Sequence, residues 1–134
     1  MIVDTSAAVA MLRGEPEASL YLDAMERAEV VRMSVATVLE LAIVTRASGP
    51  GVVDDFVTGM GVQLVAVDED HLRWARHALQ RYGRGSGSAA RLNFGDCFAY
   101  AAARALDEPL LLNGEDFVHT DVRRVDLGQA PERP

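Results

Sequence analysis

The chain has 134 residues, with 20 acidic and 13 basic side chains and a net charge of -7. Its length fits one domain with its own core, and an apolar fraction of 49% is that of an ordinary globular protein. The negative balance argues against a protein that coats nucleic acid, but it leaves open an enzyme acting on nucleic acid. No apolar run approaches the roughly 18 residues of a membrane span. The single cysteine, Cys97, favours a reducing, cytoplasmic location.

Short apolar runs alternate with helical patterns along the chain. Four runs are predicted to form buried strands and one more is a candidate: 1–3, 30–33, 62–67 and 110–112, with 123–127 as the candidate. The intervening segments have helical spacing: Thr5 or Ser6 to about Gly14, 17–27, 34–46, 52–60, 68–82 and 94–106. We expect Ser34 and Asp68 to cap their helices, and Thr5 or Ser6 to cap the first helix. This alternation predicts an α/β fold with helices on both faces of a parallel sheet of four to five short strands.

The glycine- and serine-rich segment 83–88 is interpreted as a mobile loop and not as a domain linker, because too little chain follows it for a second domain. We therefore expect one domain over 1–128 and a frayed tail over 129–134. Inside the helix 17–27, Leu20 and Ala24 are expected to face inward.

Four acidic residues stand where apolar elements have little use for charge. Asp4 ends the first apolar run, Glu40 interrupts the helix 34–46, Asp96 opens an alanine-rich helix, and Asp116 follows the run 110–112. An unpaired acid in such a place costs several kcal/mol. In parallel sheets, ligands bind outside the carboxyl ends of the strands, where Asp4 and Asp116 are expected. One divalent cation bound by carboxylate oxygens would compensate all four acids.

The position of Glu40 is predicted from its helix. Thr37, Leu41 and Val44 share its face by three- and four-residue spacing. We expect Leu41 and Val44 in the core, which directs Glu40 inward or to the rim of the site.

Carboxylates without histidine or cysteine select Mg²⁺ or Mn²⁺, ions that suit phosphoryl transfer. The chain lacks the HExxH spacing of zinc hydrolases, the serine-hydrolase elbow and the phosphate-binding P-loop. Each acid also has a purely structural interpretation: Asp4 beside a helix cap, Glu40 as a paired surface acid, Asp96 as a first-turn acid at a helix dipole, and Asp116 as a solvated loop residue. Ser6 beside Asp4 is either a cap or a contact to a water in the site.

Four sequence blocks together resemble a known family. They are Ile2-Val3-Asp4-Thr5-Ser6-Ala7, the segment 34–41 around Glu40, Phe94-Gly95-Asp96-Cys97 with the residues to 101, and the segment 110–117 followed by Thr120-Asp121. Their order and spacing are similar to those of PIN-domain ribonucleases, and more narrowly of VapC-type toxins of bacterial toxin–antitoxin pairs.

The resemblance implies a PIN-like three-layer α/β/α fold, an endoribonuclease dependent on Mg²⁺ (or Mn²⁺), a homodimer and a cognate VapB-like antitoxin. Carried over by position, the catalytic acids are Asp4, Glu40, Asp96 and Asp116, and the direct metal ligands are Asp4 and Asp96. The fourth block is variable in the family, so Asp121 competes with Asp116 for the last place.

Other functions are compatible with parts of the pattern. The main rival is a non-catalytic module that binds a metal or a partner through the same acids. A DNase or structure-specific nuclease is disfavoured because the short acidic chain lacks added DNA-binding elements, and a phosphatase because no nucleophilic Asp-x-Asp-x-Thr motif occurs. Arg84 and Arg91, on either side of the glycine-rich loop, are candidates for phosphate contacts or plain solvated charges.

Overall fold

The computed structural model describes residues 1–128, so the tail expected at 129–134 lies outside the described part. Its strands are β1 (Ile2–Val3), β2 (Arg32–Ser34), β3 (Gln63–Val65) and β4 (Leu110–Leu111). Its α-helices are α1 (Thr5–Leu12), α2 (Ala18–Arg27), α3 (Val35–Val44), α4 (Gly51–Gly59), α5 (Glu69–Tyr82) and α6 (Phe94–Ala105), with a 3-10 turn η1 (Arg46–Ser48) between α3 and α4. None of these helices is both long and apolar enough to cross a membrane.

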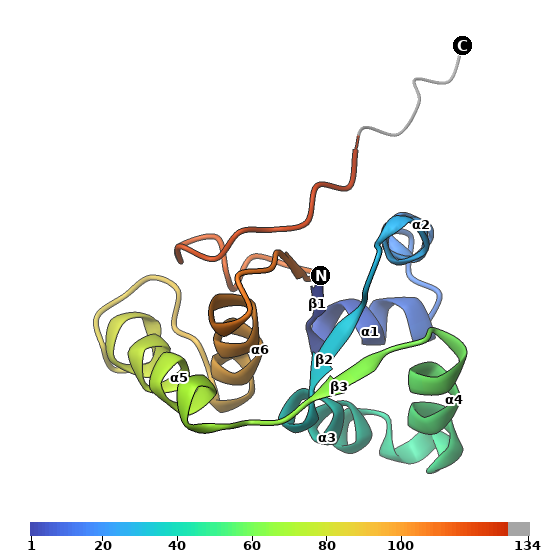
Figure 1. The fold of residues 1–134 in the computed structure, drawn as a ribbon, viewed down its shortest axis with the longest axis horizontal. Coiled ribbons are helices and arrows are strands. Elements are labelled where there is room, and N and C mark those ends of the chain that lie inside the picture. Colours follow the sequence, from blue (N-terminus) through green and yellow to red (C-terminus); the bar gives the residue numbers. More distant parts are fainter. Residues whose placement is uncertain (129–134) are drawn as a thin grey trace.

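The four strands form one parallel sheet in the order β3-β2-β1-β4. Figure 1 shows α5 and α6 together on one side of this sheet and α1, α2 and α4 on the other. The predicted three-layer α/β/α architecture is therefore confirmed. It brings the carboxyl ends of β1, β2 and β4, which are far apart in the sequence, to the same edge of the sheet.

The two apolar layers are separated by alternation along the short strands. Ile2 and Leu110 pack with α5 and α6, whereas Val3 and Leu111 pack with α1, α2 and α4. Successive strand side chains point to opposite faces, so two residues are enough to contribute to both cores. Both strands are completely covered, as expected for the centre of a parallel sheet.

Three expectations need correction or refinement. The candidate fifth strand is reduced to one parallel bridge between Arg124 and Leu110, because the chain follows β4 only briefly. The first helix is capped by Asp4, whose side chain accepts from the Ser6 amide, and not by Thr5 or Ser6. Val44 is 44% exposed, because α3 ends there and turns its last residues to solvent. Ser34 and Asp68 do cap α3 and α5.

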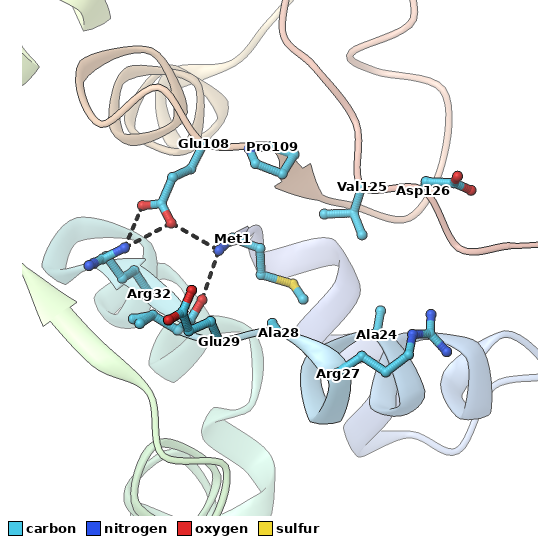
Figure 2. Close-up of a pocket in the computed structure, with 11 residues that line it drawn as sticks. Met1, Ala24, Arg27, Ala28, Glu29, Arg32, Glu108, Pro109, Val125 and Asp126 are labelled. Carbon is cyan, nitrogen blue, oxygen red and sulfur yellow. Dashed lines mark hydrogen bonds and ion pairs between the residues drawn. The ribbon is translucent and has the colours of Figure 1, made fainter.

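The amino-terminal edge of the sheet is closed by a group of ion pairs. Glu108, just before β4, accepts two bonds from Arg32 at 2.7 and 2.8 Å and one from the Met1 ammonium at 3.0 Å. Figure 2 shows these three residues at one side of a shallow pocket over α2 and the 125–126 segment. These three charged groups are thus paired with one another, which ties β1, β2 and β4 together.

Candidate active site

The four predicted acids line one cleft at the carboxyl edge of the sheet, with a volume of about 340 Å³. We call this the acid cleft and define it by Asp4, Glu40, Asp96 and Asp116. Asp4 and Asp96 are buried, Glu40 is half-buried and Asp116 is exposed at the mouth. The acids come from the end of β1, from α3, from α6 and from the loop after β4, so only the folded topology brings them together.

Asp4 uses only half of its carboxylate for the structure. Its Oδ2 accepts from the Ser6 amide at 3.0 Å and from the Ser6 hydroxyl at 2.6 Å. Its Oδ1 is buried and has no hydrogen-bond partner within the described chain. Burial raises the pKa of Asp4, the two Ser6 bonds oppose this shift, and the charge of Glu40 adds to it. Helix capping therefore explains one oxygen and leaves the other available to a ligand.

Asp96 lies in the first turn of α6, as predicted, and is held there by a capping box with Asn93. The Asp96 amide donates to the Asn93 side chain at 2.9 Å, and the Asn93 amide donates to Asp96 Oδ2 at 3.0 Å. Burial raises the pKa of Asp96 to about 6; the Asn93 bond opposes the shift, and the charges of Asp4, Asp116 and Glu40 add to it. Both buried acids thus lack a compensating positive charge.

Glu40 reaches the cleft because two neighbours make room for it and orient it. The Thr5 hydroxyl donates to the Glu40 carboxylate and connects the start of α1 to α3. On the other side, the Glu40 carboxylate packs against the backbone of α6 at Gly95, where an added Cβ would overlap it. An alanine at position 95 would therefore displace the Glu40 carboxylate. The sequence predicted that Glu40 points inward or to the rim of the site, but it gave Thr5 only a capping role and Gly95 none.

A second polar chain fixes the wall of the cleft opposite α6. Ser6 Oγ accepts from the Asn113 amide at 2.9 Å, and the Asn113 side chain accepts from the Tyr21 hydroxyl at 3.0 Å and donates to Glu15 at 3.2 Å. These bonds join β4 to α1 and α2 across about a hundred residues. No local sequence signal pointed to Asn113 or Glu15, whereas the Asn-x-x-Asp spacing of the capping box could have indicated Asn93.

The remaining candidates take different positions. Asp121, the competitor of Asp116, accepts from the Tyr100 hydroxyl at 2.7 Å and from Arg104 at 3.2 Å and does not line the cleft. Arg84 lines a neighbouring groove, while Arg91 is exposed with a positive φ of 49°. Cys97 is buried, as expected for a small apolar side chain.

The donor set of the acid cleft fits a hard divalent cation. The buried Oδ1 of Asp4 has no hydrogen-bond partner, and the pKa values of Asp4 and Asp96 are raised, so a positive charge bound here would stabilise both carboxylates. Within residues 1–128, no group of three or more histidine, cysteine or acidic side chains is placed to hold an ion in an enclosure of protein ligands alone. Mg²⁺ needs no such enclosure, since it keeps several waters and binds one or two carboxylates.

Comparison with known proteins identifies the class of protein first. The family model of the PIN domain matches residues 1–123, so the chain belongs to the PIN-domain family. The fold is shared with the crystal structure of Mycobacterium tuberculosis VapC20, described as a sarcin-ricin loop cleaving toxin. The TM-score is 0.71 at 19% identity, and the match covers 92% of this chain and 97% of that one.

Sequence relatives place the chain more narrowly. Ribonuclease VapC42 of Mycobacterium tuberculosis is 48% identical over 127 residues, covering 92% of this chain and 97% of the relative. Ribonucleases VapC28 and VapC30 of the same organism are 45% and 44% identical, over 92% and 95% of this chain and 96% and 99% of their own lengths. The chain is therefore a member of the VapC ribonuclease family, as the four sequence blocks predicted.

Proposed function

We propose that this chain is an endoribonuclease dependent on Mg²⁺ or Mn²⁺ and the toxin of a toxin–antitoxin pair. It cleaves phosphodiester bonds in a structured cellular RNA (tRNA, rRNA or mRNA) and thereby inhibits translation. The observation that carries the proposal is the meeting of four carboxylates in one cleft, with the buried Oδ1 of Asp4 unpartnered. The names of the VapC ribonucleases, 44–48% identical, support the same activity.

Each acid has a distinct part in this proposal. Asp4 and Asp96 hold the ion, and Glu40 and Asp116 complete its surroundings directly or through water. Bound there, the ion would activate a water for attack on the phosphate and stabilise the leaving oxygen. Ser6, Asn93 and Thr5 keep the first three carboxylates in place through the bonds described above. Among the described residues no histidine lines the cleft, so its carboxylates are the side chains that would accept protons there.

The partners follow from the charge and the apolar surface around the cleft. A VapB-like antitoxin would place an Arg or Lys of its C-terminal segment against Asp4, Glu40 or Asp96, since a cation compensates clustered carboxylates as a metal does. Val44, which lines the cleft, offers this segment an apolar contact, whereas Leu20 on α2 is half-buried and does not line the cleft. We further propose a homodimer, supported by the α3 side chains Leu39 and Ile43, which are 64% and 66% exposed.

The test is metal-dependent cleavage of RNA by the pure protein. Total cellular RNA is incubated with the wild type in Mg²⁺, in Mn²⁺ and in EDTA, and new 5′ ends are mapped. The proposal expects discrete new ends with either ion and none in EDTA. RNA that is bound but unchanged in length under all conditions would instead support the non-catalytic binding module.

A further inference from the structure

An apolar groove runs beside the acid cleft, between α5 and the start of α6. It has a volume of about 400 Å³ and is lined mainly by Leu72, Leu79, Phe94 and Phe98, with two arginines, Arg76 and Arg84. We call it the α5–α6 groove. Leu72 and Leu79 are 52% and 56% exposed, and Phe94 is 82% exposed, the highest value among the large apolar side chains of residues 1–128. Exposed apolar surface gathered in one groove marks a binding site more often than chance.

Phe94 presents an aromatic face. Its ring contacts Phe98 edge to face, with centroids 4.9 Å apart and planes at 83°. This pair, one helical turn apart, supports the helix only weakly. The contact leaves most of the Phe94 ring in solvent. An exposed aromatic ring is a surface on which nucleic-acid bases stack.

The groove adjoins the acid cleft at Asn93. Asn93 lines both, and the capping box that holds Asp96 starts at Asn93, one residue before Phe94. Gly95, between Phe94 and Asp96, packs against Glu40. An RNA strand whose phosphate lies in the acid cleft therefore has the α5–α6 groove on the neighbouring surface, with Asn93 between the two.

The charge of the groove is opposite to that of the protein as a whole. Arg76 and Arg84 line it, and neither forms an ion pair within residues 1–128, whereas other arginines such as Arg32, Arg73 and Arg104 do. The backbone of Arg84 is fixed at the groove, because its amide donates to the Leu92 carbonyl at 3.1 Å. Two unpaired arginines beside an apolar floor, in a chain of net charge -7, complement a polyanion that carries flat apolar groups.

We propose that the α5–α6 groove is the subsite for an unpaired nucleotide of the RNA, with its base stacked on Phe94 and its phosphate bound by Arg84. The inference rests on the proposed ribonuclease function and extends it: the nucleotide next to the phosphate in the acid cleft must be single-stranded, as in a loop or bulge. Every base has a stacking face, so this subsite selects for an unpaired base more than for its identity. The substrate class is thus RNA with an unstacked nucleotide at the cleavage position.

The experiment compares binding of two fluorescein-labelled oligomers of equal charge in EDTA. One is a twelve-residue oligoadenylate, and the other is a ribose-phosphate oligomer of the same length without bases. Phe94→Ala should weaken binding of oligoadenylate by roughly 5- to 150-fold, the range for loss of one stacked base, and leave the abasic oligomer within about twofold. Phe94→Tyr should restore binding, because it keeps the ring, and Phe94→Leu should not.

Arginine variants test the phosphate contact separately. Arg84→Gln should weaken both oligomers and lower the slope of log affinity against log salt by about 0.7, the value for one phosphate contact to a single strand. Arg124→Gln is the matched control, because it removes the same charge from an exposed position outside the groove.

Several outcomes would overturn the subsite. The first is that the wild type does not bind oligoadenylate. The second is that Phe94→Ala loses the same binding affinity for both oligomers, and the third is that it loses affinity for neither. A halved molecular mass of Phe94→Ala in sedimentation would show that a second copy of the chain occupies the groove. Failure of the proposed function is distinguishable: absence of Mg²⁺-dependent cleavage by the wild type, with Phe94-dependent binding of bases, refutes the nuclease and keeps the subsite.

Discussion

Replacing Asp96 by asparagine should abolish RNA cleavage and yet stabilise the metal-free protein. The pKa of Asp96 is raised from 3.8 to about 6, mainly by burial. This difference of about 2 units corresponds to roughly 3 kcal/mol, and solvent at the open cleft reduces it to about 1–2 kcal/mol. Asparagine keeps the shape and the oxygen that accepts from the Asn93 amide, so the capping box survives.

The sign of the pH dependence follows from the raised pKa. Below pH 3.8 the group is protonated in both states, and as the pH rises to about 6 the unfolded chain loses its proton more readily than the folded one. Stability from this group is therefore lost between about pH 4 and 6. The melting temperatures of the wild type and Asp96→Asn should be close at pH 4, and at pH 7.5 in EDTA the variant should melt about 3–8 °C higher.

Thermal melts by circular dichroism at both pH values measure this difference, with and without Mg²⁺. Addition of Mg²⁺ should raise the melting temperature of the wild type and not that of Asp96→Asn. Asp121→Asn is the matched control: it changes an acid bonded to Tyr100 and Arg104 outside the cleft, so cleavage should persist. If Asp96→Asn melts below the wild type at pH 7.5 in EDTA, the carboxylate is structural and the argument from uncompensated charge is wrong.

Three further predictions concern the acid cleft. Gly95→Ala should keep the fold but displace the Glu40 carboxylate and lower cleavage as strongly as Glu40→Gln. Gly59→Ala is the control and should cleave normally, because there is open space around its Cβ position. Normal cleavage by Gly95→Ala would show that Glu40 has no role. Mg²⁺ and Mn²⁺ should support cleavage, whereas Ca²⁺ should bind with little turnover because its looser coordination positions water poorly; equal rates in Ca²⁺ would contradict this. An antitoxin truncated at its C-terminal segment, or with the basic residues of that segment changed to alanine, should no longer inhibit, and full inhibition at equal concentration would place its contact elsewhere.

The architecture was predictable because its signals are local. Apolar runs located all four strands, and Ser34 and Asp68 marked helix starts by the hydroxyl or carboxylate that accepts from the first-turn amides. The sequence did not identify the capping residue of α1, because three neighbouring residues can all cap a helix. Asp4 took the capping role expected of Thr5 or Ser6, because its own carboxylate reaches the Ser6 amide from the end of β1.

The site was predictable in its acids and not in what holds them. Charge inside apolar elements identified the four carboxylates that line the cleft. The contacts of Thr5 with Glu40 and of Asn113 with Ser6 join residues 35 and 107 positions apart, so no periodicity or spacing could reveal them. Val44 was placed in the core by helical spacing, but spacing does not show where a helix leaves its neighbours.

The central claim is that Asp4 binds the ion on which RNA cleavage depends, and direct measurement of Mn²⁺ binding by calorimetry at pH 7.5 tests it most directly. The wild type and Asp121→Asn should bind Mn²⁺ with similar affinity and cleave RNA. Asp4→Asn keeps one oxygen to cap α1 but replaces the buried Oδ1 by an amide nitrogen and removes the charge, so it should neither bind Mn²⁺ nor cleave RNA while its circular dichroism spectrum stays that of the folded protein. Mn²⁺ binding and RNA cleavage at wild-type levels by Asp4→Asn would contradict the assignment of the acid cleft as the metal site.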